Sequence, residues 1–258
     1  MKMWKKILIT MHDMISSDKR TLAYALRFAS AIFFLFAACV CPYAKAGAAF
    51  SQTPDVIEHI RIPLWAELDA YPALAEAQDI SAGVFDYSSA RLKTLAPFII
   101  GGMVNGWNFS YTPSDKLRGV EEYMDFSPVR ELGEAERNIT YAKPRIEDGK
   151  VYCWAEFTRT EPMIQNYYLW ASITNDTVHG IGYGKISDGF DGITNAVRDA
   201  IKNAVRAYFR TKIKNKPKEI RGKVLLRREP LIGIDAGRYK VQLDFFLETD
   251  KILPYTQF

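Results

Sequence analysis

The chain has 258 residues, with 34 Lys and Arg residues, 30 Asp and Glu residues and a formal net charge of +4. Seven of the basic and two of the acidic residues lie in residues 1–46, so the remainder is close to neutral and its charge does not indicate nucleic-acid binding. Two of the three cysteines, Cys39 and Cys41, lie in the same segment, so the remainder has only Cys153 and can form neither an internal disulfide nor a cysteine-based metal site.

Residues 1–46 have the pattern of a secretory signal peptide. Basic residues precede an apolar run, Phe28 to Val40, that is shorter than the ~18 to 20 residues a membrane-spanning helix needs. Small residues follow at Ala44 and Ala46, the two positions that a signal peptidase reads. The pattern predicts cleavage after Ala46, a mature chain that begins at Gly47, and no permanent transmembrane span after processing.

Two alternatives to simple cleavage remain. Phe36-Ala37-Ala38-Cys39 is similar to a relaxed lipobox, in which Cys39 is acylated before the signal is removed. An uncleaved anchor is the other alternative. A translation start at Met14 would give a shorter signal, residues 14–46.

Residues 47–136 are expected to form a helical and β region. Leu64, Leu68 and Tyr71 share one helical face, which predicts a short helix over Pro63–Tyr71. A second helix is predicted over Tyr87–Asn105, interrupted by Pro97. Apolar and polar residues then alternate over Trp107–Thr112, as in a half-buried strand.

Residues 137–258 are expected to form an antiparallel sheet. Strands over 138–146 and 150–160 flank Asp148-Gly149, a pair typical of tight hairpin turns. A second hairpin is predicted from strands over 164–174 and 178–186, separated by Asn175-Asp176. The two hairpins together would form an antiparallel meander.

The clearest helix is predicted over Asp191–Ile213, where apolar residues recur at spacings of three and four. Two strands follow, over 219–228 and 238–247, and the second has an inward row of Tyr239, Val241, Leu243, Phe245 and Leu247. The predicted fold class is α+β: an antiparallel β meander with a long amphipathic helix packed on the sheet, and short helices near the mature N-terminus.

The stretch from residue 178 to residue 247 resembles a known module. Gly180-Ile181-Gly182-Tyr183-Gly184, the helix with Ala196, Ala200 and Ala204, and Tyr239-Lys240-Val241-Gln242-Leu243 are similar to the strand-helix-strand-strand module of small bacterial envelope lipoproteins, some of them flagellum-associated. The resemblance implies a partner-binding component of the cell envelope and assigns no site residues.

No catalytic, cofactor-binding or metal-binding residue is predicted. The glycine-rich segment His179–Gly192 lacks the spacing of phosphate-binding and dinucleotide-binding loops, and its alternating glycines more simply permit a bulge or close packing of the following helix. His59 and His179 have no neighbours at metal-ligand spacing. The acidic cluster of Glu121, Glu122 and Asp125 is more typical of a solvated surface than of a pair of catalytic carboxylates.

Two surfaces are candidates for binding. A basic ridge on the long helix could bind anionic lipid headgroups, acidic wall polymers or an acidic partner, or could simply be the solvent-exposed face of an amphipathic helix. It comprises Arg198, Lys202, Arg206 and Arg210 and is continued by Lys212, Lys214, Lys216 and Lys218. An aromatic set could line a ligand surface or pack in the core; it comprises Trp107, Phe109, Tyr111, Tyr168 and Trp170. Cys153 is predicted to be a buried, inert thiol.

The sequence favours an exported, non-enzymatic accessory or assembly factor in the periplasm or at the outer envelope. Its expected partner is an envelope protein, an anionic envelope polymer or an anionic lipid surface. The alternatives are a lipid- or glycan-binding periplasmic module and an envelope-polymer hydrolase.

Overall fold

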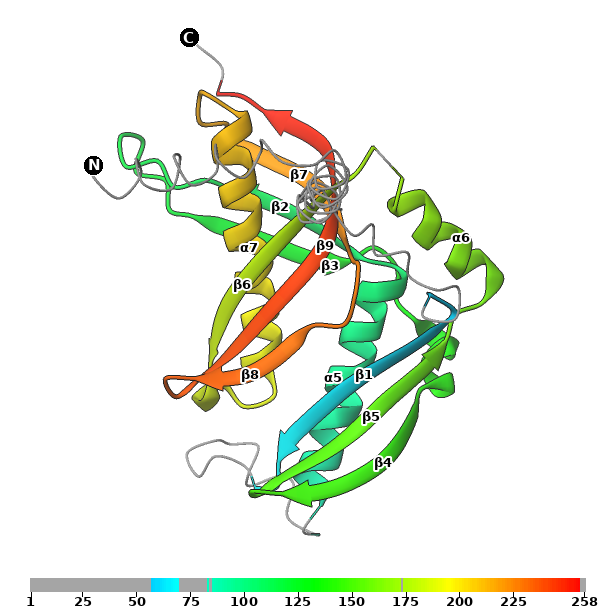
Figure 1. Cartoon of the computed structure of the whole chain (residues 1–258). Helices are drawn as coiled ribbons and strands as arrows, with labels where there is room; N and C mark the ends of the chain where they lie inside the picture. Colours follow the sequence, from blue (N-terminus) through cyan, green and yellow to red (C-terminus); the bar gives the residue numbers. More distant parts are fainter. Residues whose placement is uncertain (1–56, 70–82, 84, 173, 256–258) are drawn as a thin grey trace, which may run out of the picture. The chain divides into compact units, whose positions relative to one another are not determined.

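The computed structural model describes residues 57–69, 83, 85–172 and 174–255 (Figure 1). The predicted signal segment, with Ala44, Ala46, Gly47 and the alternative acylation site Cys39, lies outside the described residues. Of the helices in the described ranges, none combines the length and the hydropathy needed to span a membrane.

A three-stranded antiparallel sheet combines β1 (His59–Glu67), β5 (Lys150–Thr158) and β4 (Thr140–Glu147), with β5 in the centre. Strands β4 and β5 form the predicted hairpin, and Asp148 and Gly149 at its turn have φ angles of 49° and 69°. These positive values explain why the turn uses residues that tolerate the left-handed region.

The predicted helix over Pro63–Tyr71 is wrong, because residues through Glu67 belong to β1. In this strand Ile62 pairs with Ala155 and Leu64 with Cys153, and exposed and buried side chains alternate from His59 to Leu64. A spacing of four residues, as between Leu64 and Leu68, fits the strand period as well as the helical one. Pro63 is tolerated because β1 is an edge strand, whose one ladder partner among the described residues is β5.

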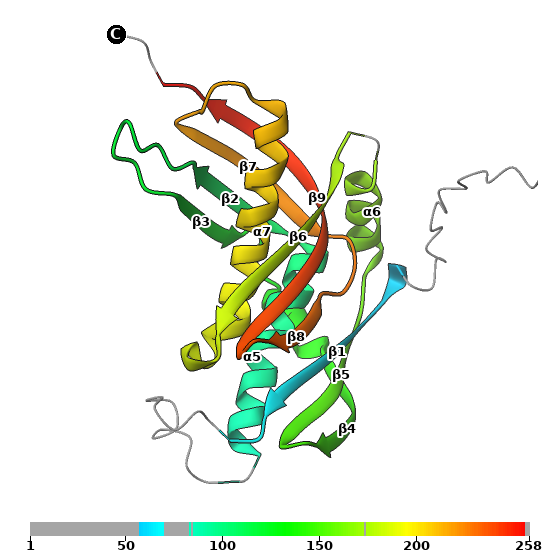
Figure 2. The ribbon, with the colours of Figure 1, turned by 60° about the vertical axis from the view of Figure 1, so that its left-hand side comes forward.

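A larger, six-stranded antiparallel sheet has the order β3-β2-β7-β9-β6, and β8 pairs with β9 (Figures 1 and 2). Its strands are β2 (Trp107–Thr112), β3 (Tyr123–Pro128), β6 (Asp176–Lys185), β7 (Glu219–Leu226), β8 (Leu231–Asp235) and β9 (Arg238–Leu253). The predicted inward row of β9 is confirmed, because all five side chains are buried.

The long helix α7 (Asp191–Lys212) packs on this sheet over a row of glycines in β6. A Cβ atom at Gly182 would lie 2.1 Å from the Ala200 nitrogen and 2.3 Å from the Ala196 oxygen. At Gly184 it would lie 1.9 Å from the Gly192 oxygen. The alternating glycines therefore permit close packing of the helix, as the sequence indicated.

The predicted strand over 164–174 is also wrong, because Glu161–Trp170 form the helix α6. Pro162 lies in its first turn, where a missing N–H costs nothing. Tyr167 and Trp170, three residues apart, share one helical face and pack with Leu225 and Phe246 in a small second core. The predicted second hairpin is therefore not formed, and β6 pairs with β9 instead.

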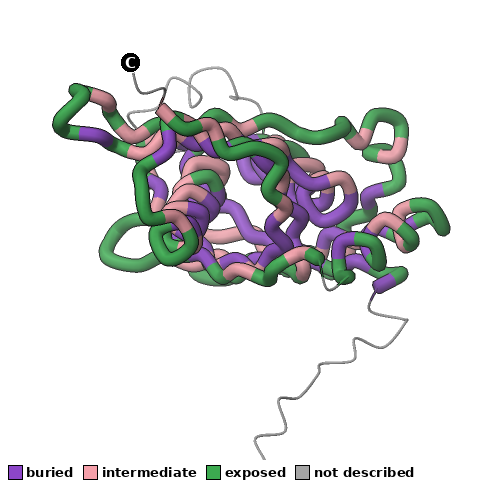
Figure 3. Tube along the Cα trace, turned by 90° about the horizontal axis from the view of Figure 1, so that it is seen from above, coloured by how far each residue is buried: buried purple, intermediate pink, exposed green. Residues whose placement is uncertain are grey.

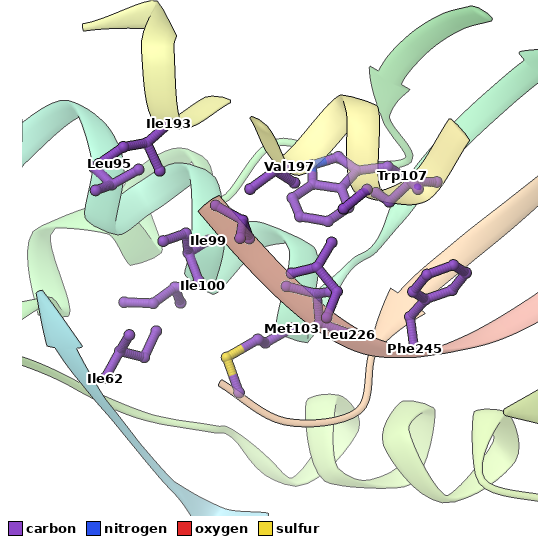
Figure 4. Close-up of a cluster of buried hydrophobic side chains, with 14 of the residues drawn as sticks. Ile62, Leu95, Ile99, Ile100, Met103, Trp107, Ile193, Val197, Leu226 and Phe245 are labelled. Atoms are coloured by element: carbon purple, nitrogen blue, oxygen red, sulfur yellow. The ribbon is translucent and has the colours of Figure 1, made fainter. Parts of the chain in front are cut away.

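Helix α5 (Asp86–Val104) connects the two sheets and continues without interruption through Pro97. It contacts β1 and β5 of the smaller sheet and β7 of the larger one. Its side chains Leu95, Ile99, Ile100 and Met103 belong to a buried cluster that also contains residues of α7 and β9 (Figure 4). Along the chain, buried segments lie inside and exposed loops outside (Figure 3).

Two buried arginines serve this packing. Arg159 donates hydrogen bonds to the carbonyl oxygens of Met103 (2.8 Å) and Ile57 (2.5 Å), and is only 4% exposed. Met103 lies in the last turn of α5, whose free carbonyls and partial negative charge favour a cation. Burial lowers the pKa of Arg159 to about 10, so it remains charged at neutral pH.

Arg91 of α5 forms the second buried contact. Its Nη1 lies 2.6 Å from Oε2 of Glu67 in β1, and the Tyr239 hydroxyl in β9 donates a 2.7 Å hydrogen bond to Oε1 of the same carboxylate. One carboxylate thus links the helix to a strand of each sheet.

The described residues lie in one compact unit, residues 52–258. The regions 47–136 and 137–258 are interleaved in it, because β1 pairs with β5 and β2 pairs with β7. Two short 3-10 helices, Gly133–Asn138 and Ile186–Asp188, complete the connections. The fold is α+β, with antiparallel sheets and a long amphipathic helix packed on the larger one, as predicted.

Candidate functional site

A cleft of about 550 Å³ lies beside the C-terminal end of α7, and we call it the basic cleft. Its walls are the last turns of α7 with the residues after them, the end of β2 with the following loop, and the start of β7. The Lys216 ammonium donates a 2.9 Å hydrogen bond to the Ser114 carbonyl, which ties the first wall to the second. Its charged side chains are Glu122, Arg206, Arg210, Lys214 and Lys216.

The carboxylate of Glu122 already has two partners inside the basic cleft. Oε1 of Glu122 accepts a 2.6 Å hydrogen bond from the Tyr111 hydroxyl, and Oε2 lies 2.8 Å from Nη1 of Arg206. Burial and the bond to Glu122 raise the pKa of Tyr111, so this hydroxyl stays protonated and keeps donating. Arg206 also donates to Oδ1 of Asn203 at 2.7 Å, which fixes its guanidinium.

Three cations remain in the basic cleft after this pairing. Within the described ranges Arg210, Lys214 and Lys216 have no carboxylate within ion-pair distance, and all three are exposed. Four basic side chains against one acidic side chain give the cleft a formal net charge of +3. A concave surface of this charge concentrates anions.

The loop beside the basic cleft ends in an exposed apolar tip. Leu117 is 96% exposed and stands between Lys116 and Arg118. The loop is ordered: Asp115 and Val120 exchange two backbone hydrogen bonds, and the Asp115 carboxylate lies 2.6 Å from Nη1 of Arg118. That contact with Arg118 holds the pKa of Asp115 below its usual range.

The structure divides the predicted basic ridge. Arg206 and Arg210 line the basic cleft, but Arg198 lies 6.0 Å from the centre of the Phe126 ring in a separate hollow. Lys202 pairs with Asp199 at 3.0 Å. The first two members therefore do not contribute to the cleft.

Most of the predicted aromatic surface is core. Trp107, Phe109, Tyr111 and Trp170 are 2%, 3%, 3% and 8% exposed, so the alternative of core packing applies to them. Tyr168 on α6 is 48% exposed. Of these residues Tyr111 still reaches the basic cleft, through its hydroxyl group.

The acidic cluster and the histidines do not form one site. Glu122 lies in the basic cleft, while Oδ1 of Asp125 accepts a hydrogen bond from the Phe126 backbone N–H. Nδ1 of His59 lies 3.2 Å from Oγ1 of Thr158, and Nδ1 of His179 lies 2.8 Å from Oδ1 of Asp244. Within the described ranges no cluster of three or more His, Cys, Asp or Glu side chains could hold a metal ion.

Cys153 is buried, as predicted, and burial raises the pKa of its thiol.

The outer edge of β6 is partly covered by α7, because Asp199 accepts a hydrogen bond from the Tyr183 N–H and Asn203 donates one to the Ile181 carbonyl. This edge is therefore only partly available for strand addition.

The sequence missed the basic cleft as a unit. The run Lys212 to Lys218 is visibly basic, but nothing in the sequence placed it beside the loop that follows β2. That proximity depends on the pairing of β2 with β7, in which Tyr111 lies opposite Ile220.

Comparison with known proteins identifies relatives without assigning an activity. A protein of Treponema pallidum (strain Nichols), described as uncharacterized, is 30% identical over 226 residues, which cover 86% of this chain and 94% of the relative. No solved structure matches. A protein-family model matches residues 45–255. The chain therefore belongs to the family that this model describes, and the Treponema protein is its relative.

Proposed function

We propose that the protein is an exported, non-enzymatic accessory factor of the cell envelope that docks on an anionic surface through the basic cleft. The observation that carries this proposal is a group of three cations without a carboxylate partner among the described residues, Arg210, Lys214 and Lys216, beside the exposed tip of Leu117. Anionic lipid headgroups attract each nearby Lys or Arg by about 1 kcal/mol. An exposed leucine between two basic residues adds apolar contact with such a surface.

Export rests on the signal pattern of residues 1–46. The resemblance of residues 178–247 to envelope lipoproteins agrees with the same location. The test is the intact mass and N-terminal sequence of the protein purified from its native host. A chain that begins at Gly47 supports export with cleavage, and an acylated Cys39 supports a lipid-anchored form. An intact N-terminus would contradict export with processing.

Docking is tested by co-sedimentation with vesicles of phosphatidylcholine, with and without phosphatidylglycerol. We expect binding only to the anionic vesicles, and weaker binding at high salt because screening acts on exposed charges. The variant Arg210→Gln with Lys214→Gln removes two cations, which should cost about 2 kcal/mol, or about 30-fold in affinity.

The matched control is Arg198→Gln with Lys202→Gln, which removes the same charge from a part of α7 outside the basic cleft. Glutamine keeps a helix propensity close to that of arginine and lysine. Equal loss in both variants would mean that net charge, not the cleft, attracts the surface. Binding to a soluble polyanion without binding to vesicles would instead identify a polymer as the partner.

The basic residues at this position have a second effect. Cations near the end of a helix stabilise it through the helix dipole, by about 0.3–1 kcal/mol each. Urea unfolding of both variants measures this effect on stability separately from the effect on binding. A loss of stability does not by itself change vesicle binding by 30-fold.

A further inference from the structure

The basic cleft differs from an ordinary basic surface patch in its floor. Tyr111, Phe209 and Ile220 line it and are 3%, 6% and 1% exposed. The cations therefore stand beside buried, apolar side chains and are not surrounded by water on all sides. A charge beside a wall of low dielectric acts more strongly on a bound anion than a charge in water.

The two arginines of the basic cleft lie near the same hydroxyl group. Burial raises the pKa of Tyr111, and the charges of Arg206 and Arg210 act on this pKa in the opposite direction. Glu122 and Asn203 already hold the guanidinium group of Arg206. Arg210 has no hydrogen bond or ion pair with another described residue, so its planar guanidinium group is free to bind a ligand.

Two lysines add to the positive charge from the segment that follows α7. The Lys216 ammonium uses one of its three N–H groups in the 2.9 Å hydrogen bond to the Ser114 carbonyl. Lys214 has no carboxylate partner among the described residues. Together with Arg210, these lysines direct three positive charges at one cavity of about 550 Å³.

Much of the positive charge around the basic cleft is already neutralised. Three cations next to it in the chain pair with carboxylates: Arg118 with Asp115, Lys212 with Asp176 and Arg221 with Glu219. A long polyanion would need a continuous track of cations without such partners. The arrangement therefore favours a compact anion with more than one negative charge.

We infer that the basic cleft binds the phosphomonoester headgroup of a membrane lipid of the phosphatidate type. A phosphomonoester has three acceptor oxygens and about 1.5 to 2 negative charges at pH 7. Three cations match it better than they match the single charge of a phosphodiester, and arginine binds phosphate oxygens in pairs. The inference rests on the docking proposed above and names the headgroup that the cleft selects.

The position of the loop after β2 favours a lipid over a free phosphate ester. This loop lies at the same end of the larger sheet as the last turn of α7 (Figure 1). Its tip, Leu117, is 96% exposed. An apolar tip gains contact only where the bound phosphate lies at a membrane.

Co-sedimentation with vesicles matched in charge tests the inference. One set contains phosphatidylcholine with phosphatidate, and the other contains phosphatidylcholine with about twice as much phosphatidylglycerol, at pH 8, where a phosphomonoester is fully ionised. We expect at least about tenfold tighter binding to the phosphatidate vesicles. Equal binding would overturn the inference and leave surface docking intact. Binding to neither set would contradict both.

The variant Arg210→Lys separates recognition of phosphate from attraction of charge. It keeps the charge and nearly the same helix propensity, but it loses the planar group. Binding to phosphatidylglycerol vesicles should be unchanged, and most of the preference for phosphatidate should disappear. The control Arg198→Lys, outside the basic cleft, should change neither. A wild-type preference in Arg210→Lys would mean that the cleft does not recognise the phosphate.

A gain of affinity provides a test that misfolding cannot imitate. Glu122→Gln raises the formal net charge of the basic cleft from +3 to +4 and releases Arg206. Titration calorimetry with dihexanoyl phosphatidate, below its micelle-forming concentration, should show about fivefold tighter binding. Glu121→Gln removes the same charge from a residue that does not line the cleft, and it should change binding less than about twofold.

Two results of this calorimetry would overturn the inference. Equal effects of Glu121→Gln and Glu122→Gln would place the anion outside the basic cleft. Binding of glycerol 3-phosphate to the wild type as tightly as dihexanoyl phosphatidate would identify a free phosphate ester, not a lipid, as the ligand.

Discussion

Substitution of Gly182 by Ala should displace α7 from the larger sheet. The new Cβ would lie 2.1 Å from the Ala200 nitrogen, 2.3 Å from the Ala196 oxygen and 2.7 Å from the Ala200 Cα, whereas ordinary contacts begin near 3.4 Å. All three are backbone atoms of α7, so no side-chain rotation relieves the overlap. The helix must move away by roughly 1 Å, and a gap of that size loses a quarter to a half of the dispersion attraction across it.

The expected loss of stability is at the upper end of the range for overpacking. Extra methylenes in a well-packed core typically cost about 1–3 kcal/mol. Here the displaced helix has a buried stripe that includes Ile193, Val197 and Ile201, so we expect a loss of about 3 kcal/mol. For a domain of this size that corresponds to a decrease of roughly 6–12 °C in Tm.

Urea unfolding of purified wild type and variant measures this difference. The matched control is Gly233→Ala in β8, where nothing lies within 4 Å of the added Cβ and the free energy of unfolding should change by less than about 0.5 kcal/mol. A Gly182→Ala protein within about 0.5 kcal/mol of wild type would show that α7 does not rest on the glycine row.

Three further predictions concern buried or paired groups, each measured by denaturant unfolding. Arg159→Met should cost about 3 kcal/mol, because two interior carbonyls lose their donor. Tyr239→Phe should cost about 1–2 kcal/mol near neutral pH, because Glu67 loses a donor. Burial raises the pKa of Tyr239, so the folded chain holds this proton when an unfolded tyrosine has lost it, and the difference from wild type should shrink above about pH 10. Asp115→Asn should destabilise the chain at neutral pH. Arg118 lowers the pKa of Asp115, so its contribution is fully present above the unfolded pKa of about 4 and is lost as the pH falls from there through the lower folded pKa.

The elements predicted correctly are those whose pattern has one interpretation. The α7 stripe and the β9 row follow the helical and strand periods over many residues, and both are buried as expected. The β1 error arose because a spacing of four fits both periods. The α6 error arose because its buried contacts, Tyr167 and Trp170 with Leu225 and Phe246, join segments distant in sequence.

The missed strand β8 illustrates a related limit. Leu231–Asp235 is short and mostly exposed, and it contains Gly233, so the sequence indicated only a connection. It becomes a strand because Ala236 and Gly237, with φ angles of 50° and 70°, form a two-residue turn onto β9.

The exposure of Tyr141 and Ile146 could not be predicted either, since it depends on how far α5 extends across the smaller sheet. Tyr141 and Ile146 are unremarkable in a strand pattern, because half of any strand's side chains face the core. Only the position of β4, paired to β5 beyond the reach of the helix, leaves these two side chains exposed.

The prediction of the basic ridge was only partly correct, and the reason is geometric. An α-helix turns by about 100° per residue, so residues four apart drift by about 40°, and the ridge from Arg198 to Arg210 sweeps about 120° around α7. One concave surface cannot include all four members, and only Arg206 and Arg210 reach the basic cleft. The other cations there, Lys214 and Lys216, follow the helix and have no helical period. A search for anionic partners should therefore be guided by the basic residues at the C-terminal end of α7 and not by the basic residues along the whole helix.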